Sequence, residues 1–273
     1  MLRRIPITAW IGLVLTALFV LSAIFAPWLA PYPNAAIVGG VWEPASDQFL
    51  LGTDNLGRDL LSRMIYGGRT TLTIAALATA LSFGLGSILG FAAAVIGGWI
   101  DQLLSRCVDL LMSIPTLIFA LVVLSVLPSS IPILIIVMGL LDSTRVYRLA
   151  RAVAVDINVM DFVEAAKLRG EGRGWIIFRE ILPNALSPLV AELGLRFIFA
   201  VLFLSALSFL GLGVQPPDAD WGAMVRENKE GIVFGIPAAL IPAAAISVLA
   251  ISVNLVADWV LNRTADLKGG RSG

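Results

Sequence analysis

Residues 72–96 read LTIAALATALSFGLGSILGFAAAVI and contain no charged side chain. A bilayer core about 30 Å thick is crossed by about 20 helical residues at 1.5 Å each. This stretch therefore predicts a membrane-spanning helix. Its glycines, Gly84, Gly86 and Gly90, favour close packing, because small residues let two helix backbones approach each other in lipid.

Five further stretches match the same template, at residues 8–26, 103–127, 131–149, 189–212 and 236–261. The composition agrees, since 58% of the 273 residues are hydrophobic and only 14% are charged, against about 25% charged in soluble domains. This balance excludes an ordinary soluble enzyme and a disordered chain. We predict an all-α integral membrane protein with six transmembrane helices in a single domain, residues 1–273. The first stretch exceeds the apolar core of a cleaved signal peptide, about 7–15 residues, so we expect a retained span.

The basic residues predict the orientation of these spans. With the N-terminus inside, 13 Lys and Arg fall inside and 5 outside, and Arg196 lies within the fifth span. Arg3, Arg4 and Arg271 are among the inside residues. Because cytoplasmic loops carry the excess of Lys and Arg, we expect both termini to be cytoplasmic.

The residue types that are missing narrow the function. The chain has no histidine and one cysteine, Cys107, so it has neither a disulfide nor a Cys-rich metal site. None of its three lysines follows a glycine-rich phosphate loop, which argues against ATP binding by that route. With 19 basic and 19 acidic residues, no net positive field attracts nucleic acid. We predict no metal site, no cofactor bound by this chain and no nucleic-acid partner.

The predicted cytoplasmic loop at about 150–187 lies in the most densely charged part of the chain. Within it, residues 161–168 (DFVEAAKL) predict a short helix whose Ala165 and Ala166 permit close approach to another surface. Gly170 and the two glycines that follow favour a sharp turn behind this helix. A solvated connector is the alternative, but it does not account for the alanine pair, the glycines and the apolar run 175–178 together. We therefore predict a docking segment.

The residues in this loop resemble a known motif. Glu164-Ala165-Ala166, Gly170 and then Ile181-Leu182-Pro183-Asn184 look like the EAA loop of ABC-importer permeases. Residues 51–63 (LGTDNLGRDLLSR) and 208–222 (SFLGLGVQPPDADWG) resemble stretches of the second permease subunit in the dipeptide, oligopeptide and nickel uptake family. The resemblance extends from about residue 51 to residue 261.

This resemblance implies a type I ABC-importer permease fold and a transport function without enzyme activity. The EAA loop would form a coupling helix that inserts into a cytoplasmic ATPase. Seven residues would serve this coupling: Glu164, Ala165, Ala166, Gly170, Ile181, Leu182 and Pro183. The implied partners are two cytoplasmic ABC ATPase subunits that use ATP and Mg, a homologous second permease, an extracytoplasmic binding protein and the bilayer of a bacterial inner membrane.

The sequence departs from the family where an intramembrane carboxylate is usual, since residues 204–206 read Leu-Ser-Ala in place of Glu-Ala-Ser. Glu192 and Arg196 lie four apart in the same span and could pair with each other. Ionisable residues inside spans indicate functional positions. The candidates for the translocation path or its gate are Asp109, Pro115, Glu192 and Arg196.

Several polar positions keep two interpretations. Asp109 either lies on the path or pairs with Arg106 at the end of its helix, and Asp142 is expected to pair with Arg145. The outer segment 214–235 predicts a rigid turn and an amphipathic surface helix, which either receives a binding protein or rests on the membrane. The same alternatives hold for residues 31–69. Five tryptophans near span ends predict an aromatic belt: Trp28, Trp42, Trp99, Trp221 and Trp259.

Other function classes fit less well. An intramembrane aspartyl protease would need two carboxylates together, but Asp109 and Asp142 each have an arginine three residues away. An autonomous secondary transporter would show two internal repeats, and the sequence has no self-similar halves. An exporter-type subunit is a further alternative within the ABC class. The sequence does not name the solute.

Overall fold

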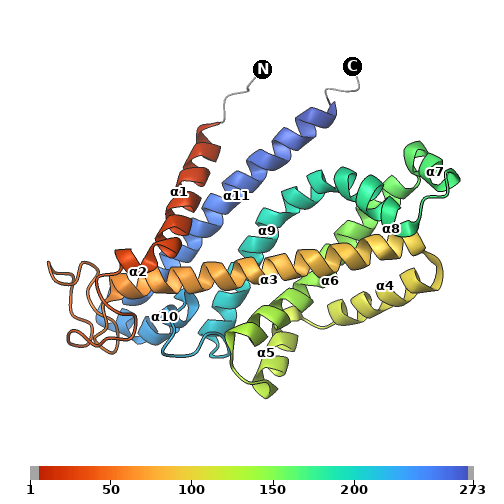
Figure 1. Ribbon diagram of the computed structural model, residues 1–273. Helices are drawn as coiled ribbons and strands as arrows, with labels where there is room; N and C mark the ends of the chain where they lie inside the picture. Colours follow the sequence, from red (N-terminus) through yellow and green to blue (C-terminus); the bar gives the residue numbers. More distant parts are fainter. Residues whose placement is uncertain (1–5, 270–273) are drawn as a thin grey trace.

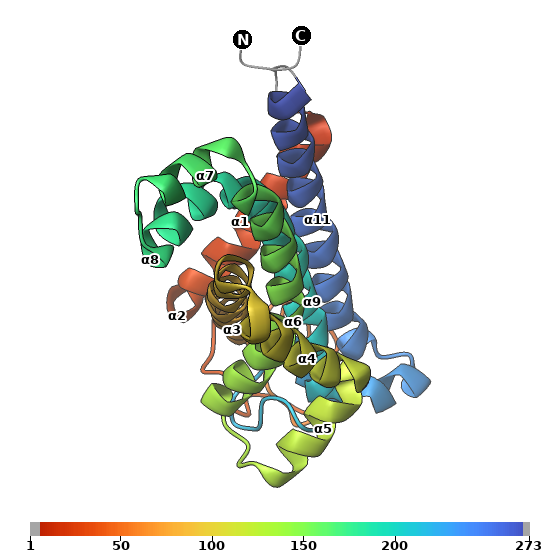
Figure 2. The same cartoon turned by 90° about the vertical axis from the view of Figure 1, so that its right-hand side faces the viewer.

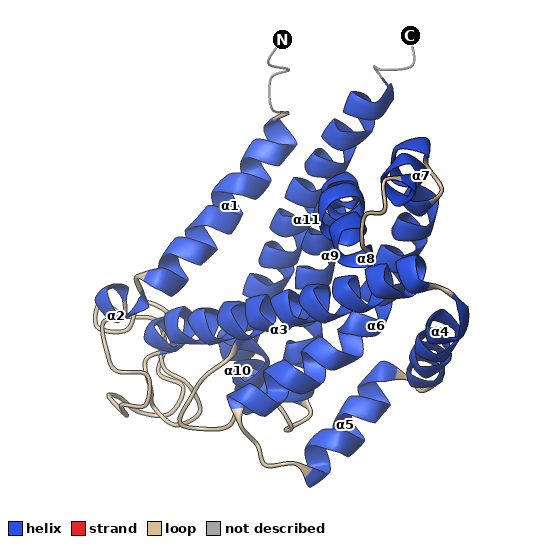
Figure 3. Ribbon diagram, turned by 45° about the vertical axis from the view of Figure 1, so that its right-hand side comes forward, coloured by secondary structure: helices blue, strands red, loops and turns tan. Residues whose placement is uncertain are grey.

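The computed structural model describes residues 6–269, and this part of the chain is built from helices (Figure 1 and Figure 3). The α-helices are α1 (Ile7–Ile24), α2 (Ala26–Leu29), α3 (Leu60–Ile96), α4 (Gly98–Ser113), α5 (Thr116–Val126), α6 (Ile131–Asn158), α7 (Asp161–Leu168), α8 (Arg173–Trp175), α9 (Leu182–Phe209), α10 (Trp221–Asn228) and α11 (Leu240–Gly269). A π-helical turn, Ile176–Ile181, joins α8 to α9, and 3-10 turns at Lys229–Phe234 and Pro237–Ala239 join α10 to α11. Arg3, Arg4 and Arg271, which enter the orientation argument, lie outside the described residues.

Four of the described helical stretches are long and apolar enough to cross a membrane: Ile7–Ile24, Leu60–Ile96, Arg173–Phe209 and Pro237–Leu261. The pair α4 and α5 adds a fifth if it counts as one bent span. The fourth predicted span, residues 131–149, falls in α6, which is long enough but carries Asp142, Arg145 and Arg148 within its first 18 residues. The structure therefore gives an all-helical protein with four to five apolar candidate spans.

The third predicted span, residues 103–127, is broken. Its two halves, α4 and α5, meet at an angle of 87°. Pro115 explains the break, because proline lacks a backbone N–H and forces the preceding residue out of helical conformation. Ile114 accordingly has an extended backbone, with φ −93° and ψ 132°. A single straight helix over 103–127 is thus incorrect.

Several helices extend beyond the predicted spans. α3 begins at Leu60, where the Asp59 side chain caps it by accepting a hydrogen bond from the Ser62 N–H at 2.8 Å. α6 continues to Asn158 and α9 begins at Leu182, so both enter the stretch 150–187 that was expected to be a loop. The connecting part of that loop is shorter than predicted, and α7 lies within it.

The molecule has two ends with different contents. The start of α1, the end of α11 and α7 lie at one end, which we call the α7 end (Figure 1 and Figure 2). α10 and the segment 30–59 lie at the opposite end, which we call the loop end (Figure 1 and Figure 3). α1 packs along α11, and α3 packs chiefly against α6.

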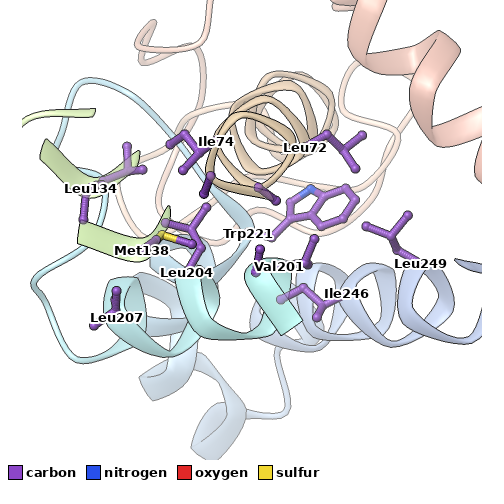
Figure 4. Close-up of a cluster of buried hydrophobic side chains, with 14 of the residues drawn as sticks. Leu72, Ile74, Leu134, Met138, Val201, Leu204, Leu207, Trp221, Ile246 and Leu249 are labelled. Atoms are coloured by element: carbon purple, nitrogen blue, oxygen red, sulfur yellow. The ribbon is translucent and has the colours of Figure 1, made fainter. Parts of the chain in front are cut away.

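The main hydrophobic core lies where α3, α6, α9, α10 and α11 meet (Figure 4). Trp221 of α10 is 2% exposed and lies among Leu72, Val201, Ile246 and Leu249. Trp28 and Trp99 are exposed, as an interfacial belt requires. The belt assignment is therefore wrong for Trp221, and α10 is a core helix with a buried face, where the sequence predicted a surface helix.

α3 and α6 approach each other closely at two glycines. A Cβ atom on Gly86 would lie 2.7 Å from the Ser143 carbonyl oxygen, and one on Gly90 would lie 2.8 Å from that of Tyr147. Gly84 faces away, and a Cβ there would meet nothing within 4 Å. The packing role predicted for these glycines is confirmed for Gly86 and Gly90.

Candidate functional site

α7 presents an exposed face at the α7 end of the molecule. Glu164 and Ala165 are exposed, whereas Ala166 is fully buried. Gly170 ends the segment with φ +84°, a left-handed conformation that favours glycine, and a side chain there would meet no neighbour within 4 Å. The helix is therefore attached through one face and open to solvent on the other.

The predicted coupling residues divide into surface and core positions. Ala166 and Ile181 are both 0% exposed. Ile181 belongs to a buried cluster that also includes Val163 of α7 and Ala185 of α9. Pro183 is the second residue of α9 and directly follows the π-helical turn Ile176–Ile181. Val163 and Ile181 thus attach α7 to this turn, whereas Glu164 and Ala165 are exposed.

A cluster of charged side chains lies between α6 and α9, within the predicted spans. Arg196 binds Glu192 at 2.6 Å, so the pair expected from their spacing is present. The second partner of Arg196 is Asp142 at 3.4 Å, which also accepts a hydrogen bond from Ser82 of α3 at 3.2 Å. The expected pair of Asp142 with Arg145 is absent from the ion pairs of residues 6–269. Arg196 therefore bridges the two carboxylates.

A cavity of about 380 Å³ lies beside this cluster. Its polar lining includes Thr79, Asp142 and Arg145, and Pro115 at the break between α4 and α5 also lines it. The apolar lining comes mainly from Leu117, Met138, Leu141, Phe199 and Phe203. Volumes of about 300–1,000 Å³ are typical of small-molecule sites. The cavity is therefore large enough for a small solute and has charge on one part of its wall.

Asp109 lies apart from this cavity. It pairs with Arg148 of α6 at 2.6 Å, and both side chains are more than half exposed. The expected alternative partner, Arg106, does not form the pair. Asp101 of α4 binds Arg151 of α6 through both carboxylate oxygens, at 2.5 and 2.6 Å. Two ion pairs thus connect α4 to α6 on the side of the break away from α5.

The loop end holds a second charged cluster, which is almost completely buried. Asp54 binds Arg58 at 2.6 Å and Arg63 at 2.5 Å, and Glu227 of α10 binds Arg58 at 2.8 Å and Arg63 at 2.7 Å. Burial raises the pKa of Asp54, but the N–H groups of Arg58 and Leu56 and the Arg63 guanidinium outweigh it and hold that pKa below its usual value. The cluster ties the segment before α3 to α10.

Asn228 strengthens this connection, since its side-chain oxygen accepts hydrogen bonds from the Trp42 indole at 3.2 Å and the Asn55 N–H at 3.0 Å. Sequence reasoning missed this arrangement. Asp54, Arg58 and Arg63 belong to the 51–63 stretch that carries the family resemblance, but nothing in their spacing points to Glu227, more than 160 residues away.

No three His, Cys, Asp or Glu side chains gather as a metal ion would require within the part of the chain that the structure describes. The sequence-based expectation of no metal and no cofactor stays a prediction.

An all-helical chain with several apolar candidate spans, a cavity beside a cluster of ion pairs and a short exposed helix at one end suits a membrane transport protein. Residues 82–266 match the family described as the binding-protein-dependent transport system inner membrane component. Residues 8–56 match the N-terminal TM domain of oligopeptide transport permease C. The chain belongs to this permease family and is a DppC/OppC-like permease of ABC peptide transport systems.

Relatives of similar length support this assignment. The chain is 39% identical to the "Putative peptide transport system permease protein" of Brucella suis biovar 1, over 91% of this chain and 84% of that protein. It is 34% identical to the di/tripeptide transport system permease DppC of Pseudomonas aeruginosa, over 90% and 84%. It is 32% identical to the dipeptide transport system permease DppC of Alkalihalophilus pseudofirmus, over 92% and 83%. The family is one of transport permeases, and its members are multi-pass membrane proteins, not enzymes.

Proposed function

We propose that the chain is one of two membrane subunits of an ATP-driven importer in a bacterial inner membrane. It would carry a peptide or a related small solute that an extracytoplasmic binding protein delivers. The observation that carries this proposal is the family match over residues 82–266, whose description names binding-protein-dependent transport. The peptide and dipeptide permeases among its relatives support the class of solute. The other membrane subunit would be a homologous permease, which makes a heterodimer.

The proposed topology has six spans and both termini in the cytoplasm. In it, α6 also crosses the membrane, as the fourth span along the chain. Its support is the arrangement of the ends, because the start of α1, the end of α11 and α7 lie together at the α7 end (Figure 1). The excess of Lys and Arg in the segments assigned to this side agrees with it. The loop end, with α10 and residues 30–59, would face the binding protein.

The proposed coupling site is the exposed face of α7. Glu164 and Ala165 would contact a cleft on a partner ATPase, Ala166, Ile181, Leu182 and Pro183 would hold the helix in place, and Gly170 would form the turn behind it. ATP and Mg would be bound by the two ATPase subunits. Closure of these subunits would then move α7, and α9 would carry that motion towards the cavity through the continuous helical stretch Arg173–Phe209.

The cavity beside Asp142 would form part of the translocation path. Pro115 lines it, and Arg196, which also binds Glu192, pairs with the Asp142 carboxylate on its wall. Asp109 would act as a gate residue through its ion pair with Arg148, because that pair holds α4 on α6.

An uptake assay with a matched pair of variants tests the coupling role. Ala165→Trp adds bulk to an exposed position, so we expect membrane insertion at the normal level and uptake of dialanine reduced to background in cells that express the whole importer. Ala165→Ser keeps the side chain small and should transport normally. Gly170→Asp should behave like Ala165→Trp, since a side chain at φ +84° strains the turn. Normal uptake by Ala165→Trp contradicts the docking role.

Deletion of the co-encoded ATPase subunits separates this function from an autonomous carrier. If the chain belongs to an ATP-driven importer, we expect that strain to take up no dialanine. Uptake that continues without the ATPases means that the chain works as a secondary transporter, and the proposal fails.

A further inference from the structure

Arg145 differs from the other basic side chains around the cavity. Arg196 contacts two carboxylates, whereas Arg145 has no carboxylate within 4.0 Å among the described residues. Its guanidinium carbon lies 5.6 Å from the centre of the Phe199 ring, a cation–π contact shared with Arg196 at 5.0 Å. Asp142 attracts Arg145 electrostatically but does not contact it, so a negative group that enters the cavity can bind this guanidinium directly.

The depth of the site argues for a travelling ligand. Asp142 and Arg196 each lie about two helical turns inside their predicted spans, and Arg145 lies about one turn inside the end of the span 131–149, so the charged wall extends from the interior of the bundle towards the α7 end. Transporters bind substrates near the middle of the bilayer, where half-helices and polar groups meet. The break between α4 and α5 at Pro115 occurs at this same cavity.

The lining also determines which kind of anion fits. Phe199, Phe203, Leu117 and Met138 give most of the wall an apolar character, and Arg145 supplies one positive group at its edge. Asp142 on the same wall contacts Arg196 and Ser82 and not Arg145, which leaves the Arg145 guanidinium available for direct contact with a carboxylate in the cavity. A molecule with one carboxylate and an otherwise apolar or neutral body complements such a wall.

We propose that Arg145 forms a subsite in this cavity for a carboxylate group of the solute as it crosses the membrane. The C-terminal carboxylate of a short peptide has this chemistry. This inference rests on the proposed importer function, but the electrostatic character of the cavity is measurable without any transport.

The first experiment measures the electrostatic character of the cavity with small thiol reagents on the purified complete importer. The single cysteine is removed by Cys107→Ser, and Thr116→Cys places a thiol of similar size on the cavity wall. We compare how fast this thiol is modified by two methanethiosulfonates. One carries an anionic sulfonatoethyl group and the other a cationic trimethylammonium-ethyl group. Free 2-mercaptoethanol in the same buffer gives the intrinsic ratio of the two reagents.

We expect the anionic reagent to be favoured at position 116 by about tenfold over that intrinsic ratio, as a positive field in a low-dielectric cleft concentrates anions. Arg145→Gln and Arg145→Met should both abolish the preference, and Arg145→Lys should keep it. Arg69→Gln is the control, because that arginine is exposed on α3 and does not line this cavity. An unchanged preference in Arg145→Gln or Arg145→Met overturns the inference and leaves the importer function untouched.

The second experiment asks whether the solute uses the site. Dialanine uptake at saturating concentration should fall about tenfold in Arg145→Gln and stay close to the wild-type rate in Arg145→Lys. If the thiol reagents report a positive cavity but uptake is the same in Arg145→Gln, no carboxylate is recognised there and the inference is wrong. If wild-type cells take up no dialanine while the anion preference is present, the peptide cargo of the proposed function is wrong, and the same thiol assay still decides whether the cavity attracts anions.

Discussion

Asp220 is fully buried at the N-terminus of α10, where its carboxylate accepts hydrogen bonds from the N–H groups of Gly222 and Ala223 at 3.0 and 3.3 Å. Burial nevertheless raises its pKa to about 6, with Glu227 adding a smaller unfavourable charge. The folded protein therefore binds a proton at Asp220 more tightly than the unfolded chain does. A raised pKa of this kind contributes stability below the unfolded value of 3.8, and this contribution is lost as the pH rises through about 6.

This difference predicts a pH effect on unfolding. Lowering the pH from 7.5 to 5 should stabilise the wild-type complex through Asp220 by about 1 kcal/mol. Asp220→Asn keeps an oxygen acceptor for the helix cap but cannot titrate, so its stability should lack this component. Thermal unfolding of the detergent-purified complex at both pH values measures the effect. The exposed neighbour Asp218 gives the control, as Asp218→Asn should respond to pH like the wild type; identical responses from all three proteins contradict the prediction.

At the residue scale, spacing identifies partners within one helix but not across helices. Glu192 and Arg196 were expected to pair because residues four apart share a helix face, and they do. Asp142 was assigned to Arg145 by the same rule, yet it binds Arg196, 54 residues away. The rotation of α6 against α9 decides this partner, and neither helix encodes that rotation alone.

At the element scale, the α3–α6 contact depends on two positions without side chains. Gly86 and Gly90 lie one turn apart on α3, and the backbone of α6 fills the space that a Cβ would need. Additional methyl groups in a closely packed contact force the backbones apart, at a cost of about 1–3 kcal/mol.

Two alanine substitutions on α3 test this contact. Gly86→Ala should destabilise the protein by about 1–3 kcal/mol, since its Cβ would lie 2.6 Å from the Cβ of Val146. Gly84→Ala has free space and should be neutral or slightly stabilising, because alanine favours the helix by about 1 kcal/mol over glycine. The melting temperature of the purified complex distinguishes the two variants. Equal effects of both substitutions would mean that helix propensity dominates over packing at this contact.

α7 illustrates how an element divides its residues between two tasks. Ala165 and Ala166 look alike in the sequence, but Ala166 is fully buried while Ala165 is exposed. The alanine pair therefore combines one packing residue and one surface residue. A bulky side chain should disturb folding at position 166 and only docking at position 165.

At the scale of the whole molecule, two clusters hold distant parts of the chain together. The loop-end cluster joins the segment before α3 to α10 through Asp54, Arg63 and Glu227. The core around Trp221 joins α10 to α3, α9 and α11 (Figure 4). The loop end is thus one packed unit, although its parts lie more than 150 residues apart in the sequence.

The arrangement of the two ends predicts a labelling pattern for the full importer in cells. In a Cys107→Ser background, Val233→Cys at the loop end should react with a membrane-impermeant maleimide added to intact cells. Leu168→Cys on α7 should react only in inverted membrane vesicles from which the ATPase subunits have been stripped, because the proposed docking would otherwise cover α7. Both side chains are more than 80% exposed, so accessibility does not limit either reaction. Labelling of both cysteines from the same side would contradict the proposed topology.

The sequence by itself determined the class of the protein. Apolar stretches of sufficient length predict spans whatever their neighbours are, and the motifs at 51–63, 161–184 and 208–222 carried the resemblance to the permease family that the comparisons then showed. It also indicated the packing role of Gly86 and Gly90 and the pair of Glu192 with Arg196. These features depend on length, local spacing or residue size, which a linear pattern records directly.

Only the tertiary structure decided the rest. In the structure, the third predicted span bends by 87° at Pro115, Trp221 is buried in the core and Asp142 pairs with Arg196. It also brought Arg145 to the cavity without a carboxylate partner among the described residues. The physical reason is the same in each case. The angle and rotation of one helix against another set these contacts, and that geometry minimises the energy of the whole packed bundle, so no single stretch of sequence contains it.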